Sequence, residues 1–254
     1  LDKNNRFYAS AYFGKDKFFA RYSDSFFGKG EAGLFWKNAT TTLRWNHLFN
    51  DRLFANTSFI YSDYALQIFL NEKYDGYGYN LSYSSGIRDL GLKYDLSWHP
   101  LPGHMIRFGV QSIYHRFRPS AVVLRDDYNQ EYEENIEQID VLESGIYLED
   151  EFSIGPRLSL NPGIRLSHFL HKDRHYLNPE PRFAALYMLG RGISWKMSYA
   201  SMSQYVHLLS PTGIGLPTDL WVPSTNRVKP QFTWQLATGL AGEPAGNTME
   251  LSAE

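Results

Sequence analysis

The sequence contains no cysteine, which excludes a disulfide framework and a thiolate metal site. It also contains no run of roughly 18 to 20 apolar residues, and this excludes a transmembrane helix. Basic and acidic residues nearly balance at a formal net charge of −2, so no basic field indicates a nucleic-acid partner. Helical periodicity is almost absent from the 254 residues. A chain of this length can form one large domain or two small ones. The lack of helical periodicity indicates that it is built mainly from elements other than helices.

Aromatic residues, in contrast, are abundant. They make up 16% of the chain, mainly as 18 tyrosines and 17 phenylalanines. Aromatic side chains suit the pleated surface of a β-sheet. They also form the girdles at the two boundaries of a membrane-spanning barrel. The mean hydropathy of −0.41 is polar for a membrane protein, so composition by itself does not indicate a membrane.

Apolar and polar residues alternate with a period of two along most of the chain, which predicts β-strands. In residues 88–99 one face carries Leu90, Leu92, Tyr94, Leu96 and Trp98, and the other carries Asp89, Gly91, Lys93, Asp95, Ser97 and His99. The same alternation recurs at 53–62, 104–111, 157–170 and 192–200, and more weakly at 39–49, 140–153, 181–189 and 231–240. With the terminal segments RFYASAYFG and NTMELSAE, the pattern predicts about eleven strands.

The predicted connections alternate between short and long. The short ones fall at 49–51, 100–103, 154–156, 190–192 and 243–247, and carry the Gly, Pro, Asn and Asp of tight turns. The long ones fall at 14–38, 65–84, 119–139, 171–180 and 202–230. One end of the sheet therefore has tight turns and the other has large loops, as in a transmembrane barrel of the bacterial outer membrane.

Two all-β architectures fit this alternation. A soluble antiparallel sandwich or barrel also alternates apolar and polar residues. The long strands and the charged face, which suits a wet lumen, favour an antiparallel transmembrane β-barrel. The rings of Trp45, Trp98, Trp195 and Tyr94 lie on the apolar face, several of them near a short turn, where an interfacial girdle belongs. We predict the transmembrane barrel.

A barrel must close, because an open edge in lipid leaves backbone groups unsatisfied. Bacterial single-chain barrels have an even number of strands, whereas the pattern indicates about eleven. The last residues, MELSAE, lie inside a predicted strand. We therefore expect residues 1–254 to be a partial β-barrel domain of a longer polypeptide.

Three segments carry a resemblance to a known family. They are Pro179-Glu180-Pro181-Arg182, the run SYASMSQYVHLLS at 198–210, and GLPTDLWVPSTNRVKPQ at 215–231. Residues 179–240 as a whole resemble the barrel of TonB-dependent outer-membrane transporters, most of all the type with a carboxypeptidase-regulatory-like extension found in Bacteroidetes. The segment LRWNHLFNDRLFANTSFIYSDY at 43–64 looks like a strand–turn–strand of the same family.

The resemblance implies a barrel of about 22 strands that encloses a plug domain. It implies that the plug and the remaining strands lie outside this chain, and that a TonB box contacts the TonB complex. The implied function is active import of a metal chelate, cobalamin, haem, an oligosaccharide or a peptide across the bacterial outer membrane. Outer-membrane lipids and a surface lipoprotein are the further implied partners. The alternatives are a passive porin-like channel and a soluble β-rich surface-binding module.

The connection at 202–230 is the predicted ligand-binding loop, because its aromatic and polar tips suit contact with a partner. The candidate residues are Tyr205, His207, Asp219, Trp221, Asn226 and Arg227. The alternative is that the loop folds over the barrel wall. In that case Leu208, Leu209, Leu216, Leu220 and Val222 pack internally.

Two other connections are less specific. The acidic segment 119–139 has oxygen ligands but lacks the spacing of an EF-hand loop, so we expect a solvated loop. In segment 14–38 we expect Phe18, Phe19, Phe26, Phe27 and Phe35 to form a small core within an ordered loop, rather than to stack on a flat ligand. The eight histidines are scattered, and we assign no metal, no cofactor and no enzyme activity.

Overall fold

The structure is a computed structural model that describes residues 2–24, 28–74, 77–126, 131–135, 137–172, 174–190, 192–209, 220–242 and 251–253. No helix in these ranges is long and apolar enough to cross a membrane. The strands are β1 (Asn5–Asp24), β2 (Gly28–Asn50), β3 (Leu53–Tyr74), β4 (Tyr77–Trp98), β5 (His104–Asp126), β6 (Glu131–Asn135), β7 (Ile139–Ile154), β8 (Leu158–His171), β9 (Arg174–Gly190), β10 (Ile193–Gln204), β11 (Val206–Leu209), β12 (Leu220–Pro223), β13 (Gln231–Gly242) and β14 (Leu251–Ala253).

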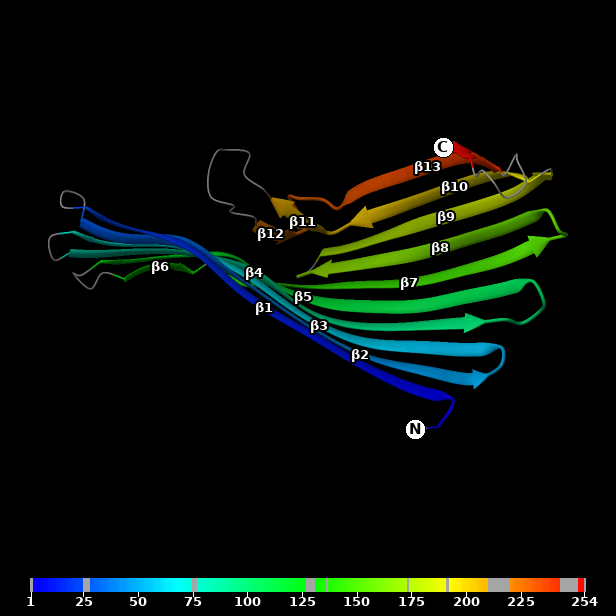
Figure 1. The fold of residues 1–254 in the computed structure, drawn as a ribbon, viewed down its shortest axis with the longest axis horizontal. Helices are drawn as coiled ribbons and strands as arrows, with labels where there is room; N and C mark the ends of the chain where they lie inside the picture. Colours follow the sequence, from blue (N-terminus) through cyan, green and yellow to red (C-terminus); the bar gives the residue numbers. More distant parts are fainter. Residues whose placement is uncertain are drawn as a thin grey trace.

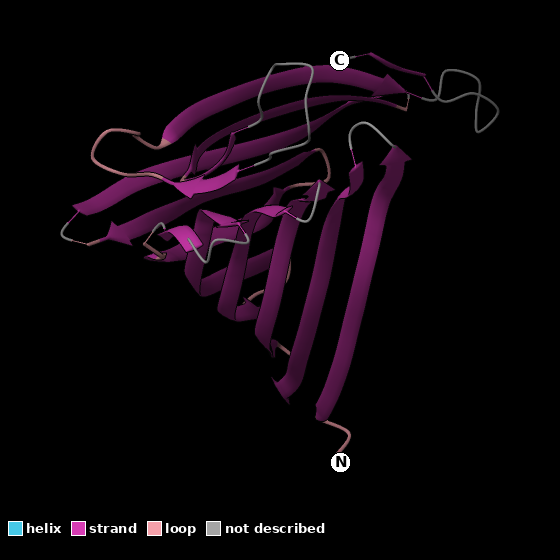
Figure 2. Ribbon diagram, turned by 90° about the vertical axis from the view of Figure 1, so that its left-hand side faces the viewer, coloured by secondary structure: helices cyan, strands magenta, loops and turns pink. Residues whose placement is uncertain are grey.

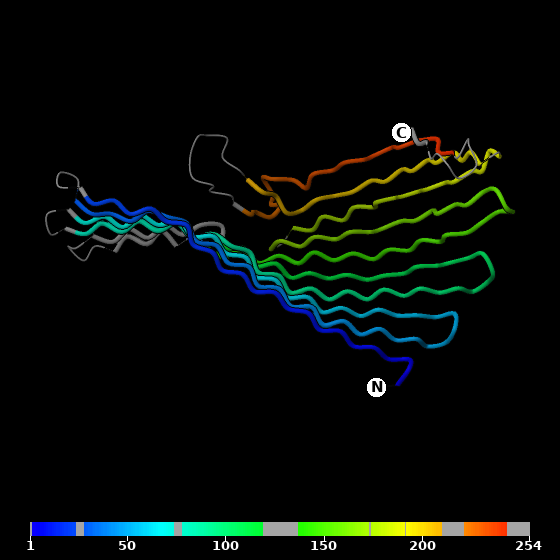
Figure 3. Tube along the Cα trace, viewed as in Figure 1, coloured from blue at the N-terminus to red at the C-terminus, as the bar shows by residue number. Residues whose placement is uncertain are grey.

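Sequence neighbours pair along one continuous antiparallel sheet. Its order is β1-β2-β3-β4-β5-β7-β8-β9-β10-β13-β14, and β6 pairs with β5. The colours therefore run in sequence order from one edge of the sheet to the other (Figure 3). In the end view the sheet curls like part of a barrel wall (Figure 2). The strands on this path correspond to the predicted alternating segments, so the predicted antiparallel β-barrel fold is confirmed.

The short connections lie together at the end of the sheet that also holds the N-terminus (Figure 1). They include turns at 51–52 and 155–157 and the loop at 99–103. Gly103 and Gly155 have φ angles of +81° and +64°, in the left-handed region that favours glycine. A Cβ atom would meet no atom within 4 Å at either position, so the backbone conformation alone selects glycine. The predicted tight-turn end is confirmed at these connections.

At the opposite end, the predicted loops 14–38, 65–84 and 171–180 are wrong; in the last of these β8 pairs with β9 from His171 and Arg174 onward. The pairing of β1 with β2 continues without interruption to Asp24 and Gly28, and that of β3 with β4 continues to Tyr74 and Tyr77. Charged and polar residues on the outward face, including Lys15, Lys17 and Gln67, broke the apolar alternation in these segments, but the ladder satisfies the backbone whatever the side chains are. The strands β1–β5 therefore project beyond the rest of the sheet (Figure 1).

The small phenylalanine core expected in 14–38 is also wrong for the residues described. Phe18 and Phe19 are consecutive in a strand, so their rings lie on opposite faces, and both are exposed. Phe26 and Phe27 lie outside the described residues.

In the acidic segment 119–139, the backbone forms the hairpin of β5 and β6, whereas residues 127–130 and 136 lie outside the described ranges.

One face of the sheet carries an apolar band that includes exposed residues such as Phe59, Leu92 and Trp98. On β3 it extends from Leu53 to Tyr61, and on β4 from Trp98 to Leu90, its register partner. Each of these stretches has roughly nine residues, the length that a tilted strand needs to span a membrane. Within the band the hydroxyl groups of Ser112 and Ser144 hydrogen-bond to each other at 3.1 Å, so neither is left unpaired in lipid.

The predicted aromatic residues lie on this apolar face. Trp45, Trp98 and Trp195 are exposed. The indole N–H of Trp45 donates to Asn5 Oδ1, and that of Trp195 donates to Thr238 Oγ1, both at 2.9 Å. An exposed ring whose polar edge is satisfied suits the interface between lipid and water.

The other face is charged and paired, and we call it the inner face. Arg107 Nη1 lies 2.9 Å from Glu149 Oε1, and Lys93 Nζ lies 3.2 Å from Asp95 Oδ2. The hydroxyl group of Tyr147 donates to Asp95 Oδ1 at 2.7 Å. These contacts join β4, β5 and β7 across a polar surface, as expected for a wet lumen.

Candidate functional site

The connection between β10 and β13 folds back against the inner face. Its β11 and β12 form a separate two-stranded antiparallel sheet in which His207 pairs with Val222 (Figure 1). Phe117, Val141, Phe169 and Tyr205 form a buried cluster, with Val206 and Trp221 packed against it. We call residues 205–209 and 220–228, which include β11 and β12, the inner hairpin. The only hydrophobic core cluster found among the described residues is thus the place where this hairpin docks on the wall.

Tyr205 anchors the inner hairpin. Its ring is 2% exposed and stacks on Phe169 of β8, with ring centroids 4.9 Å apart and planes at 3°. Its hydroxyl oxygen lies 2.7 Å from Ser167 Oγ and accepts a hydrogen bond of 2.7 Å from Asn178 Nδ2. One side chain therefore combines an apolar contact with a satisfied polar group, which fixes its orientation.

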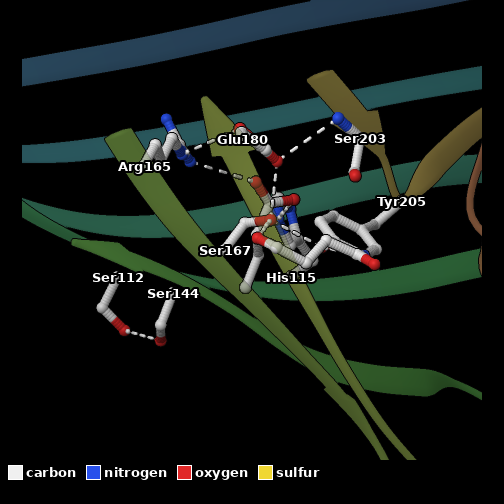
Figure 4. Close-up of polar contacts among 10 residues, drawn as sticks. Ser112, His115, Ser144, Arg165, Ser167, Glu180, Ser203 and Tyr205 are labelled. Atoms are coloured by element: carbon white, nitrogen blue, oxygen red, sulfur yellow. Dashed lines mark hydrogen bonds and ion pairs between the residues drawn. The ribbon is translucent and has the colours of Figure 1, made fainter. Parts of the chain in front are cut away.

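Glu180 of β9 extends this network (Figure 4). Its carboxylate accepts hydrogen bonds from Ser167 Oγ at 2.6 Å and from the backbone N–H of Ser203 at 3.2 Å. Arg165 Nε lies 3.6 Å from Glu180 Oε2. The carboxylate is almost fully buried, and the two hydrogen bonds together with the charge of the nearby guanidinium group compensate for its burial. Ser167 connects Glu180 to Tyr205, so the hairpin and the wall share one polar network.

Acidic and basic side chains alternate from this network across the inner face. Arg165 Nη2 lies 3.9 Å from Glu143 Oε1, and His115 Nε2 lies 3.9 Å from Glu143 Oε2. His115 Nδ1 is 2.8 Å from Asp89 Oδ1. The row therefore joins β4, β5, β7, β8 and β9. Within the described ranges, no group of three or more His, Asp or Glu side chains has the geometry to hold a metal ion.

His207 also lies near the base of the inner hairpin, close to Tyr205 in the sequence. It is 5% exposed, and its Nε2 lies 2.9 Å from the Oγ atom of buried Ser224. Its Nδ1 is buried without a hydrogen-bond partner in the described part of the chain. Burial lowers the pKa of the imidazole, so His207 is neutral at pH 7.

A tight turn at 225–228 presents two of the predicted residues. The backbone N–H groups of Arg227 and Val228 donate to Thr225 Oγ1 at 3.2 and 3.1 Å. The hydroxyl group of Tyr176 on β9 donates to the Thr225 carbonyl oxygen at 2.8 Å, which attaches the turn to the wall. Asn226 and Arg227 are exposed at its tip.

The structure separates the predicted site residues into distinct environments. Tyr205 and His207 are buried, Trp221 is half-buried against the core cluster, and Asn226 and Arg227 are exposed. Asp219 lies outside the described residues. Leu208 and Leu209, which the alternative placed in an internal cluster, are exposed.

Sequence reasoning did not assign Ser167, Asn178 or Glu180 to this site. Glu180 belongs to one of the family-like segments, and Ser167 lies on the polar face of its alternating strand. Those signals indicated the inner face. No local signal could pair them with Tyr205, which lies far along the chain.

A curved antiparallel sheet with an apolar exposed band, a charged inner face and a hairpin folded onto that face defines the wall of an outer-membrane β-barrel. The chain belongs to the TonB-dependent receptor-like β-barrel family, because residues 2–253 match the sequence model of that family. Receptors of this family lie in the bacterial outer membrane and are transporters, not enzymes.

Solved structures share the fold at low sequence identity. The chain is 14% identical to the ferric-catecholate import receptor Fiu from E. coli K12 (TM-score 0.61), covering 87% of this chain and 40% of that one. It is 12% identical to the siderophore receptor PiuA from Acinetobacter baumannii (TM-score 0.62), covering 99% and 47%. It is also 12% identical to BauA, the ferric preacinetobactin receptor from the same organism (TM-score 0.55), covering 96% and 43%. The chain thus spans less than half the length of these receptors, and no curated protein sequence matches it.

Proposed function

We propose that this chain forms part of the barrel wall of a TonB-dependent importer that carries a nutrient across the outer membrane. The observation that carries this proposal is the family match over nearly the whole chain. The inner hairpin supports it, because a segment folded onto the charged inner face narrows the route that a ligand must take.

The complete importer would contain parts that lie outside these residues. We propose a plug domain, further strands and a TonB box that contacts the TonB complex. A carboxypeptidase-regulatory-like extension of the Bacteroidetes type and a surface lipoprotein partner belong to the same proposal. Their support is the sequence resemblance at 179–240.

Within the predicted site, we propose a division of roles. Asn226 and Arg227 contact the ligand, because they are exposed on a turn fixed to the wall by Tyr176. Tyr205, His207 and Trp221 hold the hairpin that presents the turn. Asp219, which lies between β11 and β12, remains a predicted ligand contact.

Uptake by the full-length receptor tests the function. A ferric catecholate siderophore is the first probe, since structures that share the fold are named for such ligands. Haem, cobalamin and a maltooligosaccharide complete the panel. In a strain that carries the full-length gene, we expect one of these to accumulate against its gradient, and accumulation should stop when the proton-motive force is collapsed. The matched deletion strain provides the baseline.

Uptake that continues down a gradient after the proton-motive force is collapsed would favour the passive channel instead. For the ligand that accumulates, Arg227→Ala should weaken binding by roughly tenfold or more, as truncation of a central arginine contact does. Lys229→Ala, an exposed residue near the same turn, is the matched control. Equal effects of the two substitutions would contradict the assigned role of Arg227.

A further inference from the structure

On the lipid-facing side of the sheet, charged side chains replace apolar ones at the edge of the apolar band that lies away from the tight turns. We call this edge the upper edge. In the register, Tyr61, Leu90 and Tyr114 lie side by side as the last apolar row. The next outward-facing row contains Asp63, Arg88, Arg116 and Asp140 as direct partners, and the row beyond it contains Lys15, Lys37 and Arg118. Alternation keeps all of these side chains on the face that carries the band.

Basic residues outnumber acidic residues at this edge. We call Lys15, Lys37, Arg88, Arg116 and Arg118 the outer cationic cluster; its acidic partners are Asp63 and Asp140. Asp63 alone is shared by three of the cations. Lys37 Nζ lies 3.0 Å from Asp63 Oδ2, and Arg118 Nη2 and Arg88 Nε lie 2.9 and 3.5 Å from Oδ1.

The geometry leaves positive charge available to a further partner. The Asp63 side chain is only 5% exposed, whereas those of Lys37, Arg88 and Arg118 are 35%, 42% and 36% exposed. Among the side chains that the structure describes, one buried carboxylate thus gathers three cations and neutralises only one of their charges. Arginine forks of this kind match the geometry of a phosphate group.

The position of the outer cationic cluster relative to the membrane indicates which kind of anion it can bind. It follows directly on the apolar band at the end away from the tight turns, which in outer-membrane barrels is the extracellular end. A group on the lipid-facing side at this height meets the headgroups of the outer leaflet. From Lys15 on β1 to Arg116 on β5 the cluster crosses four strand spacings, about 19 Å at ~4.8 Å each, which is wide for a single phosphodiester.

We propose that the outer cationic cluster binds the headgroup of a phosphorylated glycolipid in the outer leaflet, with phosphate groups on Lys37, Arg88 and Arg118. Lys15, whose Nζ lies 5.0 Å from the centroid of the Phe35 ring, flanks the site at one edge, and Arg116 flanks it at the other. This inference rests on the lipid-facing side of the barrel and is independent of what the receptor imports.

Native mass spectrometry of the full-length receptor in detergent tests the site, with bisphosphorylated lipid A as the probe. The double substitution Lys37→Gln/Arg88→Gln leaves Arg118 paired with Asp63, and we expect it to reduce the bound fraction by roughly tenfold. Asp63→Asn removes the negative charge and should keep or increase binding. Lys93→Gln, which removes a cation from the inner face, should change nothing.

Folding is checked by heat-modifiable migration on gels, so that lost binding is read only from folded protein. If Lys37→Gln/Arg88→Gln binds lipid A as the parent does, the cluster is a set of structural ion pairs and the proposal is wrong. Binding lost equally in Asp63→Asn would also contradict it, because excess charge would then not be the cause. If phosphatidylglycerol competes as well as lipid A, the assignment to a glycolipid fails.

Discussion

At the scale of single residues, side chains on consecutive positions have opposite tasks. On β5 Arg116 and Arg118 face the lipid side, whereas His115 and Phe117 face the inner side and belong to the charged row and the core cluster. Tyr205 combines two roles in one side chain, because its ring stacks on Phe169 and its hydroxyl group belongs to the hydrogen-bond network of Ser167. The function of each position follows from the face it occupies and its height in the wall.

The burial of His207 predicts a pH dependence for docking of the inner hairpin. Its pKa is lowered in the docked state, so the undocked hairpin binds a proton more readily. The contribution of His207 to docking is therefore fully present above the ordinary histidine pKa of about 6.5, and it is lost as the pH falls through the lower pKa of the docked state. Hydrogen exchange of residues 205–209 and 220–228, corrected for intrinsic rates, should show more frequent opening at pH 5 than at pH 7.5.

The variant His207→Gln provides the control for this prediction, because glutamine can accept from Ser224 but does not titrate in this range. Its exchange should show little difference between the two pH values. A pH dependence of equal size in the variant would assign the effect to another group.

At the scale of elements, the strands are longer than the membrane requires. The apolar band takes up about nine residues of β3 and β4, close to the ~9–11 needed to span, and the rest of each strand extends outward. Because the apolar band lies on one face of the sheet, a charge introduced on that face should destabilise the barrel, whereas a charge on the opposite face should not.

Arginine substitutions in β5 test this sensitivity. Val110→Arg places a charge on the lipid side in the middle row of the band and should destabilise the barrel by about 2–4 kcal/mol. Gln111→Arg, the next residue, faces inward and should have little effect. Leu90→Arg, at the upper edge of the band, should cost about 0–1 kcal/mol. Refolding equilibria of the full-length protein in urea with lipid vesicles would measure all three, and equal losses for Val110 and Gln111 would contradict the assignment of faces.

The strands and their faces could be predicted from the sequence because alternation is local. The continuation of β1–β4 beyond the band could not, since Lys15, Lys17, Arg21 and Lys37 put charge on the outward face and the segments then read as loops. The site could be predicted only in part. The 202–230 connection was identified from its composition, whereas its attachment to Ser167 and Glu180 depends on contacts between residues far apart in the chain.

At the scale of the whole molecule, the two ends of the wall differ. Tight turns gather at one end, and the long hairpins and the outer cationic cluster lie toward the other (Figure 1). The two faces differ as well, with an apolar exposed side and a charged side that holds the inner hairpin. The wall therefore has a defined orientation in the membrane.

Single cysteines test that orientation, since this chain has no cysteine of its own. Ser23→Cys lies in the outer part of β1, and Asp51→Cys lies in a tight turn, both exposed. On intact cells a membrane-impermeant maleimide should label Ser23→Cys and leave Asp51→Cys unlabelled until the outer membrane is permeabilised. The parent protein gives the background, and labelling of Asp51→Cys alone on intact cells would invert the orientation.

The docking of the inner hairpin has a consequence for how the wall is assembled. Apart from the pairing of β10 with β13, which the inner hairpin separates in sequence, the pairings along the main sheet join elements that follow closely, so loop closure is inexpensive and these strands can associate one after another. The hairpin is different, because β12 contacts β4 and β5, and Tyr205 contacts β8 and β9. Those strands must stand in register before these contacts exist. The hairpin therefore docks late, and its burial reports that the preceding half of the wall has been built correctly.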